Sequence, residues 1–176
     1  MDKKQLRKEI AAKKAALTPA ARLAEEAAIW AAVESLDGFA KASAVLLYCS
    51  LPDEVSTGDF IRKWHHQKRI ILPLVSGDTL LLKEYVPERT HPGYKSIIEP
   101  DEDLPDIDPA VIDLAIIPGV AFDRKGLRLG RGKGFYDRLL PALACPTLGV
   151  AYRCQLLEAL PADPWDRKVS LVITAD

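Results

Sequence analysis

The chain has 176 residues, of which 48% are hydrophobic and 28% are charged, and its formal net charge is −1 at pH 7. This length and composition predict one globular domain, residues 1–176. A net charge near zero argues against nucleic acid or membrane partners recruited by overall charge. The three cysteines lack Cys-x-x-Cys spacing, so they indicate neither a disulfide framework nor a zinc knuckle. No apolar run approaches the roughly 20 residues of a membrane span, and we expect a cytoplasmic protein.

The N-terminal part is expected to be helical. Residues 3–16 are rich in alanine, lysine and leucine, and Leu6 and Ile10 lie four positions apart on one helical face. Thr18 followed by Pro19 is a helix-start signal, an N-cap residue and then proline in the first turn. We therefore expect N-terminal helices over residues 3–36, followed by an α/β core over residues 43–176.

The second of these helices is expected to end near residue 36, with Gly38 as its stop signal. At helical spacing, its apolar stripe consists of Leu23, Ala27 and Trp30.

Short apolar strands alternate with helices through the rest of the chain. We expect helices at 57–67, 135–144 and 155–160, an irregular stretch from 87 to 109, and strands at 44–48, 69–73, 80–86, 112–117, 147–151 and 169–173. This alternation predicts an α/β fold with a mostly parallel sheet.

A glycine-rich basic loop follows the strand at 112–117 and precedes a helix. Gly130, Gly132 and Gly134 allow sharp turns and close approach of the backbone to a ligand. Residues 123–138 carry six basic and two acidic side chains, and residues 1–16 have the same balance. A strand, a loop of backbone N–H groups and a helix N-terminus favour a phosphate, so we expect an anion contacted from both basic segments.

The spacing of the loop does not match the common nucleotide fingerprints. Lys133 is followed by Gly134 rather than by Ser or Thr, which excludes a P-loop, and the third glycine comes one residue early for the dinucleotide motif. From spacing alone, a mobile basic surface loop and a loop that contacts nucleic acid remain open. The second of these lacks interleaved aromatic residues for base stacking.

The wider segment is more specific. Residues 118–138, PGVAFDRKGLRLGRGKGFYDR, resemble the signature of the 5-formyltetrahydrofolate cyclo-ligase family at every fixed place. Segments elsewhere resemble further family elements and occur in the same order, at 3–7, 50–57, 98–100, 148–152 and 165–166.

The resemblance implies a fold and an activity. The fold would be a three-layer α/β/α sandwich with a mostly parallel sheet, similar to sugar-phosphate isomerases and coenzyme A transferases. The activity would be closure of 5-formyltetrahydrofolate to 5,10-methenyltetrahydrofolate with MgATP, releasing ADP and phosphate. Phosphorylation of the formyl oxygen would prepare its carbon for attack by N10. The ligands would then be small molecules, and we expect a monomer.

The resemblance also implies roles for particular residues. Lys133 would neutralise the migrating phosphoryl group, and Arg131 would grip an ATP phosphate. The ATP-binding set would be Lys3, Lys4, Arg7, Arg128, Leu129, Gly130, Arg131, Gly132, Lys133, Gly134, Phe135 and Tyr136. The substrate-binding set would be Cys49, Glu54, Arg131, Gly132, Lys133, Gly134, Phe135 and Tyr152.

The resemblance places Asp137 and Asp166 at magnesium, and MgATP needs only one or two protein carboxylates. Each candidate also has a structural alternative. Asp137 suits the N-terminus of a helix, and Asp166 suits a turn. Likewise, solvated helix positions would explain Lys3 and Arg7, an exposed turn would explain Glu54, and burial in the core would explain Cys49 and Tyr152.

One segment departs from the family pattern. Relatives often carry an aromatic residue and a glycine shortly before Ile-x-Glu-Pro, whereas Tyr94 and Lys95 stand in this region here. The alternative function is therefore a relative that binds ATP or a folate but acts on another substrate or regulates a partner.

Overall fold

A six-stranded sheet forms the centre of the fold. The computed structural model describes residues 2–176, except for the side chain of Tyr94. The strand order is β11-β9-β6-β1-β2-β3, and all neighbours are parallel except the β2–β3 hairpin. The strands are β1 (Ala44–Leu46), β2 (Arg69–Ser76), β3 (Thr79–Glu84), β6 (Leu114–Ile117), β9 (Thr147–Val150) and β11 (Leu171–Ile173).

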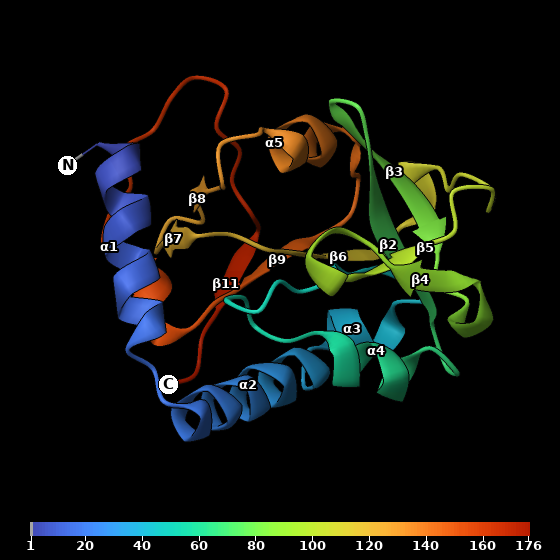
Figure 1. The fold of residues 1–176 in the computed structure, drawn as a ribbon, viewed down its shortest axis with the longest axis horizontal. Coiled ribbons are helices and arrows are strands. Elements are labelled where there is room, and N and C mark those ends of the chain that lie inside the picture. Colours follow the sequence, from blue (N-terminus) through green and yellow to red (C-terminus); the bar gives the residue numbers. More distant parts are fainter. Residues whose placement is uncertain (1) are drawn as a thin grey trace.

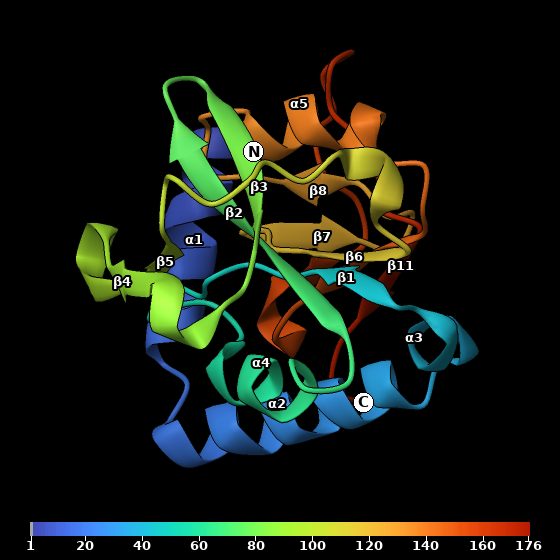
Figure 2. The same ribbon diagram turned by 90° about the vertical axis from the view of Figure 1, so that its right-hand side faces the viewer.

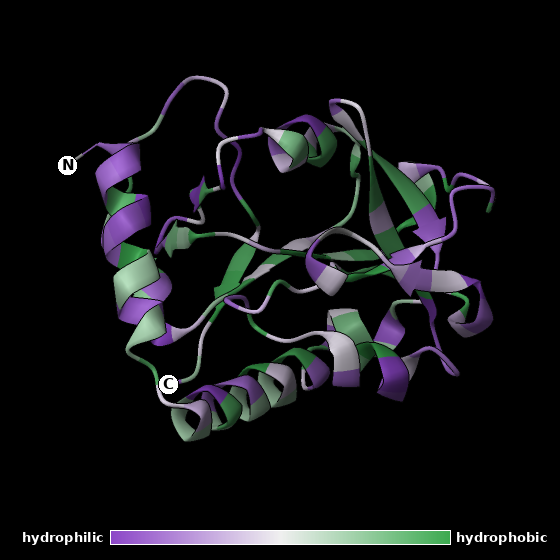
Figure 3. Cartoon of the chain, viewed as in Figure 1, coloured by the Kyte–Doolittle hydropathy of each residue, from purple (hydrophilic) through white to green (hydrophobic). Residues whose placement is uncertain are grey.

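Both faces of this sheet are buried, because successive side chains of a strand point to opposite faces. Val45 and Leu47 pack in one hydrophobic cluster, and Leu46 between them packs in the other. Leu114 and Ala115 are divided between the two clusters in the same way. Figure 3 shows hydrophobic residues along the central strands and a mixture of hydrophilic and hydrophobic residues on the helices.

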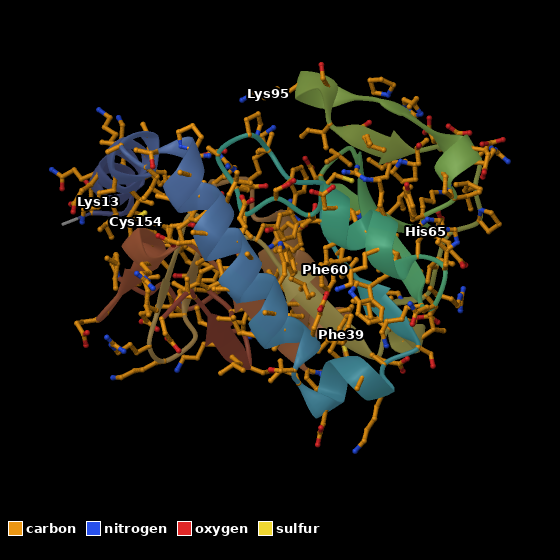
Figure 4. All side chains as sticks on the ribbon, turned by 90° about the horizontal axis from the view of Figure 1, so that it is seen from below. Lys13, Phe39, Phe60, His65, Lys95 and Cys154 are labelled. Carbon is orange, nitrogen blue, oxygen red and sulfur yellow. The ribbon has the colours of Figure 1, made fainter. Side chains whose placement is uncertain are left out.

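Helices cover the two faces and complete three layers (Figures 1 and 2). One face carries α2 (Pro19–Glu34), α3 (Asp37–Lys41) and α4 (Gly58–Trp64), and the other carries α5 (Phe135–Leu139), continued by a 3-10 turn at Leu140–Ala142. Phe39 and Phe60 join the first cluster beneath the sheet, where Figure 4 labels them, and Leu139 joins the second. The predicted α/β/α sandwich is confirmed; the further likeness to sugar-phosphate isomerases stays a prediction.

A separate small sheet holds the glycine-rich segment against the N-terminal helix. This sheet has the order β10-β7-β8, with β7 (Ala121–Asp123), β8 (Arg128–Leu129) and β10 (Leu156–Leu157). Leu6 and Ile10 of α1 (Lys3–Ala15) pack on it together with Leu127 and Leu129, as predicted for the apolar face of that helix. Figure 1 shows α1 beside β7 and β8, with only its C-terminal end next to α2.

The expectation for the second helix is wrong at its end and only partly right on its buried face, where Trp30 packs against the core as predicted. The helix ends at Glu34, and Gly38 lies inside α3 instead of stopping α2. Leu23 is 68% exposed, while Ile29 and Val33 are fully buried. The predicted cap is confirmed, because the Thr18 hydroxyl accepts the Ala21 N–H at 3.1 Å.

The expected helix at 155–160 does not form. Gln155 closes a 3-10 turn, and its buried side-chain amide donates to the carbonyls of Gly119 and Val120 at 2.9 and 3.0 Å. Leu156 and Leu157 then pair with β7 as β10. Long-range pairing with the glycine-rich segment therefore outweighs local helix propensity here.

Two helix ends and the stretch from 87 to 109 also differ from expectation. The helix that begins at Gly58 ends at Trp64, before the expected residue 67, and α5 ends at Leu139, before Pro141. The stretch expected to be irregular holds a two-stranded hairpin, β4 (Thr90–Pro92) and β5 (Ile98–Pro100).

In the part of the chain that the structure describes, no helix is long and apolar enough to cross a membrane.

Candidate active site

Three cavities surround residues 130–134. The apolar cavity, of about 400 Å³, is lined by Tyr48, Cys49, Leu51, Glu54, Pro73, Val75, Leu80, Ile97, Glu99, Pro118, Arg131, Lys133, Phe135 and Tyr136. The middle cavity, of about 280 Å³, shares much of this wall and adds Lys95, Gly119, Arg128, Gly130 and Gly134. The polar cavity, of about 450 Å³, is lined by Lys3, Arg7, Arg128, Leu129, Gly130, Gly132, Lys133, Gly134, Asp137, Arg138, Asp163, Trp165, Asp166 and Arg167.

Lys133 lines all three cavities. Its ammonium lies 6.0 Å from the centre of the Phe135 ring, and it has no carboxylate partner among residues 2–176. A cation at a shared wall, without a neutralising carboxylate, is suited to a negative charge that moves between two ligands.

The glycines give this segment a backbone that other residues rarely adopt. Gly132 and Gly134 have φ values of +105° and +70°. A Cβ on Gly134 would also lie 2.9 Å from the Arg138 guanidinium. Arg7 fixes the start of the segment, because its Nε donates to the Gly130 carbonyl at 2.8 Å. Helix α1 thus holds the loop directly.

Arg128 lies in the wall between the middle and polar cavities, and its side chain is only 4% exposed. It donates to the Pro118 carbonyl at 3.1 Å and to Asp137 Oδ1 at 3.2 Å. Its buried Nε has no hydrogen-bond partner among the described residues. An unsatisfied buried donor costs about 1–3 kcal/mol, so this atom indicates a place where a ligand can accept a hydrogen bond.

Arg131 belongs to an ion-pair network on the apolar side. Its Nη2 lies 2.6 Å from Asp53 Oδ1 and 3.0 Å from Glu54 Oε1. Lys14, although 2% exposed, also contacts Asp53 at 2.6 Å. Burial opposes charge at Asp53, but hydrogen bonds from Lys14 and Arg131 outweigh it and hold the pKa of that carboxyl below its usual value.

Two contacts hold the side chain of Glu54 in one orientation facing the apolar cavity. The Leu51 N–H donates to its Oε2 at 2.9 Å, and Arg131 holds the other oxygen. Its side chain is only 10% exposed, yet it lines the apolar cavity and can contact a ligand there.

Lys3 and Asp166 join α1 to the loop before β11. The Lys3 ammonium lies 2.5 Å from both Asp163 and Asp166. Burial lowers the pKa of Lys3, but its hydrogen bonds to these two carboxylates outweigh that effect and raise the pKa above its usual value.

Known proteins share this arrangement of fold and sequence. The model of the 5-formyltetrahydrofolate cyclo-ligase family matches residues 1–175. The chain belongs to this family. The 5-formyltetrahydrofolate cyclo-ligase of Escherichia coli is 35% identical over 142 residues, which are 76% of this chain and 78% of that protein.

Two solved 5,10-methenyltetrahydrofolate synthetases have the same fold. The Aquifex aeolicus structure has a TM-score of 0.89 and 36% identity, and covers 98% of this chain and 89% of its own. The Mycoplasma pneumoniae structure has a TM-score of 0.81 and 30% identity, with full coverage of both chains.

In this cyclo-ligase fold, the three cavities divide the predicted site residues differently from the ATP-binding and substrate-binding sets predicted from the sequence. Phe135 and Tyr136 line the apolar and middle cavities, and Gly132 lines the polar one. Arg131 does not line the polar cavity, so its expected grip on an ATP phosphate finds no support. Lys4 is exposed and lines none of the three cavities.

Tyr152 also lies elsewhere than the resemblance implied. Its side chain is fully buried, and its hydroxyl donates to Glu26 at 2.5 Å and lies 3.2 Å from the Glu54 carbonyl. The expected stacking on a folate therefore finds no support, because core side chains cover the ring. Tyr152 instead braces the backbone beside Glu54.

The sequence did not point to several residues of the cyclo-ligase cavities. Pro73, Val75 and Leu80 come from the β2–β3 hairpin, and Asp163 comes from the loop before β11. Of these, Val75 stands out only in the structure, where it is 56% exposed despite being apolar.

Cys49 lines the apolar cavity as a neutral thiol. Burial, with a smaller effect from Glu99, raises the pKa of the Cys49 thiol to about 12. We expect slow alkylation of Cys49 by iodoacetamide at pH 8 in the folded protein, because only about one thiol in 10⁴ is then ionised. Mass spectrometry of peptides from native and urea-unfolded protein measures both rates; equal rates would contradict this environment.

Proposed function

We propose that this chain closes 5-formyltetrahydrofolate to 5,10-methenyltetrahydrofolate with MgATP, and that residues 130–134 separate the two substrates. The observation that carries the assignment of the site is the position of Lys133, a cation shared by the polar and apolar cavities. MgATP supplies the phosphoryl group that makes the formyl oxygen a leaving group, before N10 attacks and the ring closes. Lys133 stabilises the negative charge on that phosphoryl group during the transfer.

The polar cavity is the proposed place for the ATP phosphates. Lys3, Arg7 and Arg128 enter it from two separate parts of the chain. The residues fit a phosphate, since Arg128 Nε is a buried donor without an acceptor and the glycine backbone approaches without side chains. Arg7 also holds the Gly130 carbonyl and therefore positions the loop as well as the ligand.

The apolar cavity is the proposed place for the folate. Phe135 and Tyr136 provide aromatic walls, and Glu54 provides one oriented carboxylate that can accept hydrogen bonds from the N–H groups of a pterin. Arg131 is a positioning residue in this scheme, because it holds Glu54 and Asp53 at 3.0 and 2.6 Å. Cys49 contributes a neutral, apolar surface.

Asp137 and Asp166 are the proposed protein contacts of the magnesium that accompanies ATP. Both line the polar cavity, and their side chains are 20% and 8% exposed. Among the described residues, no group of three or more His, Cys, Asp or Glu side chains could hold a metal. Asp163 also lines this cavity, and Lys3 contacts both Asp163 and Asp166. One or two protein carboxylates suffice for an ion whose remaining ligands are phosphate oxygens and water.

Replacing Asp137 with Asn is expected to raise the magnesium concentration that gives half-maximal activity about tenfold. The amide removes one negative charge from the polar cavity but keeps the size of the side chain and an acceptor for Arg128. Initial rates at fixed ATP and increasing MgCl₂ measure this shift. Asp59→Asn, at an exposed position in the first turn of α4, is the matched control. An unchanged magnesium profile for D137N would refute the assignment.

The proposed activity is tested by mixing the purified protein with 5-formyltetrahydrofolate and MgATP and recording the near-ultraviolet absorbance of the methenyl product. We expect the absorbance to rise with ATP and to stay flat without it. A flat trace with ATP, from folded protein that binds ATP, would reject 5-formyltetrahydrofolate as the substrate and keep the phosphate site.

We further propose that the protein acts as a single-domain cytoplasmic monomer whose ligands are small molecules rather than nucleic acid or membrane. Light scattering after size exclusion should give a mass near 19.4 kDa; a mass near twice that value would identify a dimer.

A further inference from the structure

The tip of the β4–β5 hairpin has an unusual backbone. Lys95 and Ser96 both lie in the left-handed region, with φ values of 55° and 59°. For residues with a Cβ this conformation costs about 1–2 kcal/mol each, and consecutive examples are rare. Such conformations cluster where a protein must hold a side chain at a functional position.

The surrounding contacts hold the tip in this shape. The Gly93 N–H donates to the Ile97 carbonyl at 2.7 Å, and the Ser96 N–H donates to the Gly93 carbonyl at 3.1 Å. A Cβ on Gly93 would meet the carboxylate of Glu99, so the Glu99 side chain packs directly against the glycine backbone of the turn. These contacts fix the direction in which Lys95 leaves the backbone.

Lys95 lines the middle cavity, and Ile97 of the same tip lines the apolar cavity. In Figure 4 the labelled Lys95 side chain extends beyond the tip of the hairpin ribbon. The hairpin lies far from the glycine-rich segment in sequence, yet Lys95 and Lys133 share one cavity wall.

The charge of the middle cavity points to an anionic ligand. Four cations line it, Lys95, Arg128, Arg131 and Lys133, against the single carboxylate of Glu54. Asp137 offsets Arg128, and Asp53 with Glu54 offsets Arg131. No carboxylate of residues 2–176 forms an ion pair with Lys133. A cavity with this excess of positive charge favours an oxyanion over a neutral molecule.

We propose that Lys95 binds an oxyanion of the reactants in the middle cavity, together with Lys133. This inference rests on the proposed function, whose reactants offer two such groups. One is the phosphoryl group during transfer, and the other is a carboxylate of the glutamate tail of the folate. Both accept a charge-assisted hydrogen bond from an ammonium group.

The test compares Lys95→Ala and Lys95→Arg with the wild type. K95A removes the charge, and K95R keeps a cation on a long side chain. Lys125→Ala, an exposed lysine outside all three cavities, is the matched control. We expect K95A to lower kcat/KM for 5-formyltetrahydrofolate about tenfold, the effect of one charge-assisted hydrogen bond, and K95R to stay within about threefold.

A substrate without the glutamate tail, 5-formyltetrahydropteroate, distinguishes the two oxyanions. If Lys95 binds a tail carboxylate, the loss in K95A appears in KM and disappears with the pteroate substrate. If Lys95 binds the phosphoryl group, the loss appears in kcat and persists with both substrates.

Two results would overturn the role of Lys95: K95A matching the wild type on both substrates, or K95R losing as much as K95A. A folded wild type without turnover would instead reject the proposed function. Calorimetric titration with 5-formyltetrahydrofolate and with ATP then decides the role of Lys95. A tenfold weaker affinity of K95A for either ligand supports the role, and equal affinities for both overturn it.

Discussion

Lys133→Ala is expected to lower kcat about a thousandfold or more while the protein remains folded. Lys133 is the described cation that lines all three cavities, and it forms no ion pair with a carboxylate of residues 2–176. Removing a preorganised group that stabilises charge in the transition state costs about 10²–10³ in kcat, and cations at transferring phosphoryl groups cost about 10³–10⁵. The absorbance assay with saturating MgATP measures the loss.

The stability of this variant should be unaffected, since Lys133 makes no side-chain hydrogen bond among the described residues and lies in an exposed part of the loop. Equal thermal midpoints of K133A and wild type check that expectation, and Lys125→Ala again serves as the matched control. A K133A protein that retains more than about a tenth of the wild-type kcat would contradict the assigned role.

Gly149→Ala is expected to destabilise the fold by about 3 kcal/mol, although it adds a single methyl group. A Cβ at this position of β9 would lie 2.5 Å from Cε1 of Phe122, whose side chain is fully buried. The same ring fills the space beside Gly119, where a Cβ would lie 2.7 Å away. Overpacking of a core costs about 1–3 kcal/mol, and here the ring cannot move toward either glycine. Thermal unfolding should show a midpoint lower by about 10 °C.

A control and a rescue test the cause of this loss. Gly38→Ala adds the same methyl group where no atom lies within 4 Å, and helix propensity predicts an unchanged or slightly higher midpoint. Replacing Phe122 with Leu in the G149A protein should restore part of the lost stability, because the smaller side chain relieves the contact. Additive losses in the double variant would show that Phe122 is not the obstacle.

Local sequence signals were sufficient for the central strands. Each is a short apolar run whose alternate residues, such as Val45 and Leu46, face the two layers of helices. A strand buried on both faces can be recognised from its continuous apolar run, without an alternation of polar and apolar residues. The start of α2 was equally clear, because Thr18 caps it with its own side chain and Pro19 fits the first turn. These features depend on neighbours in the chain.

Predictions failed where distant contacts decide. Gly38 was read as a stop signal, yet it lies in α3, whose Phe39 is buried against α4 through Phe60 and Trp64. Residues 155–160 resemble a helix in sequence, but β10 pairs with β7, and Gln155 donates to the Gly119 carbonyl just before β7. Helix propensity differences of a few tenths of a kcal/mol cannot oppose buried pairing of this kind.

For the site, the sequence determined which residue types gather around the loop, because the motif at 118–138 lies on one continuous segment. Only the tertiary structure decided which ligand each side chain can meet. Arg131 and Lys133 are two residues apart, but carboxylates of the loop after β1 hold Arg131 on the apolar side, while Lys133 lines all three cavities around residues 130–134. Carboxylates and backbone carbonyls that are distant in sequence hold these cations in position, and a local sequence pattern does not predict which partner each cation has.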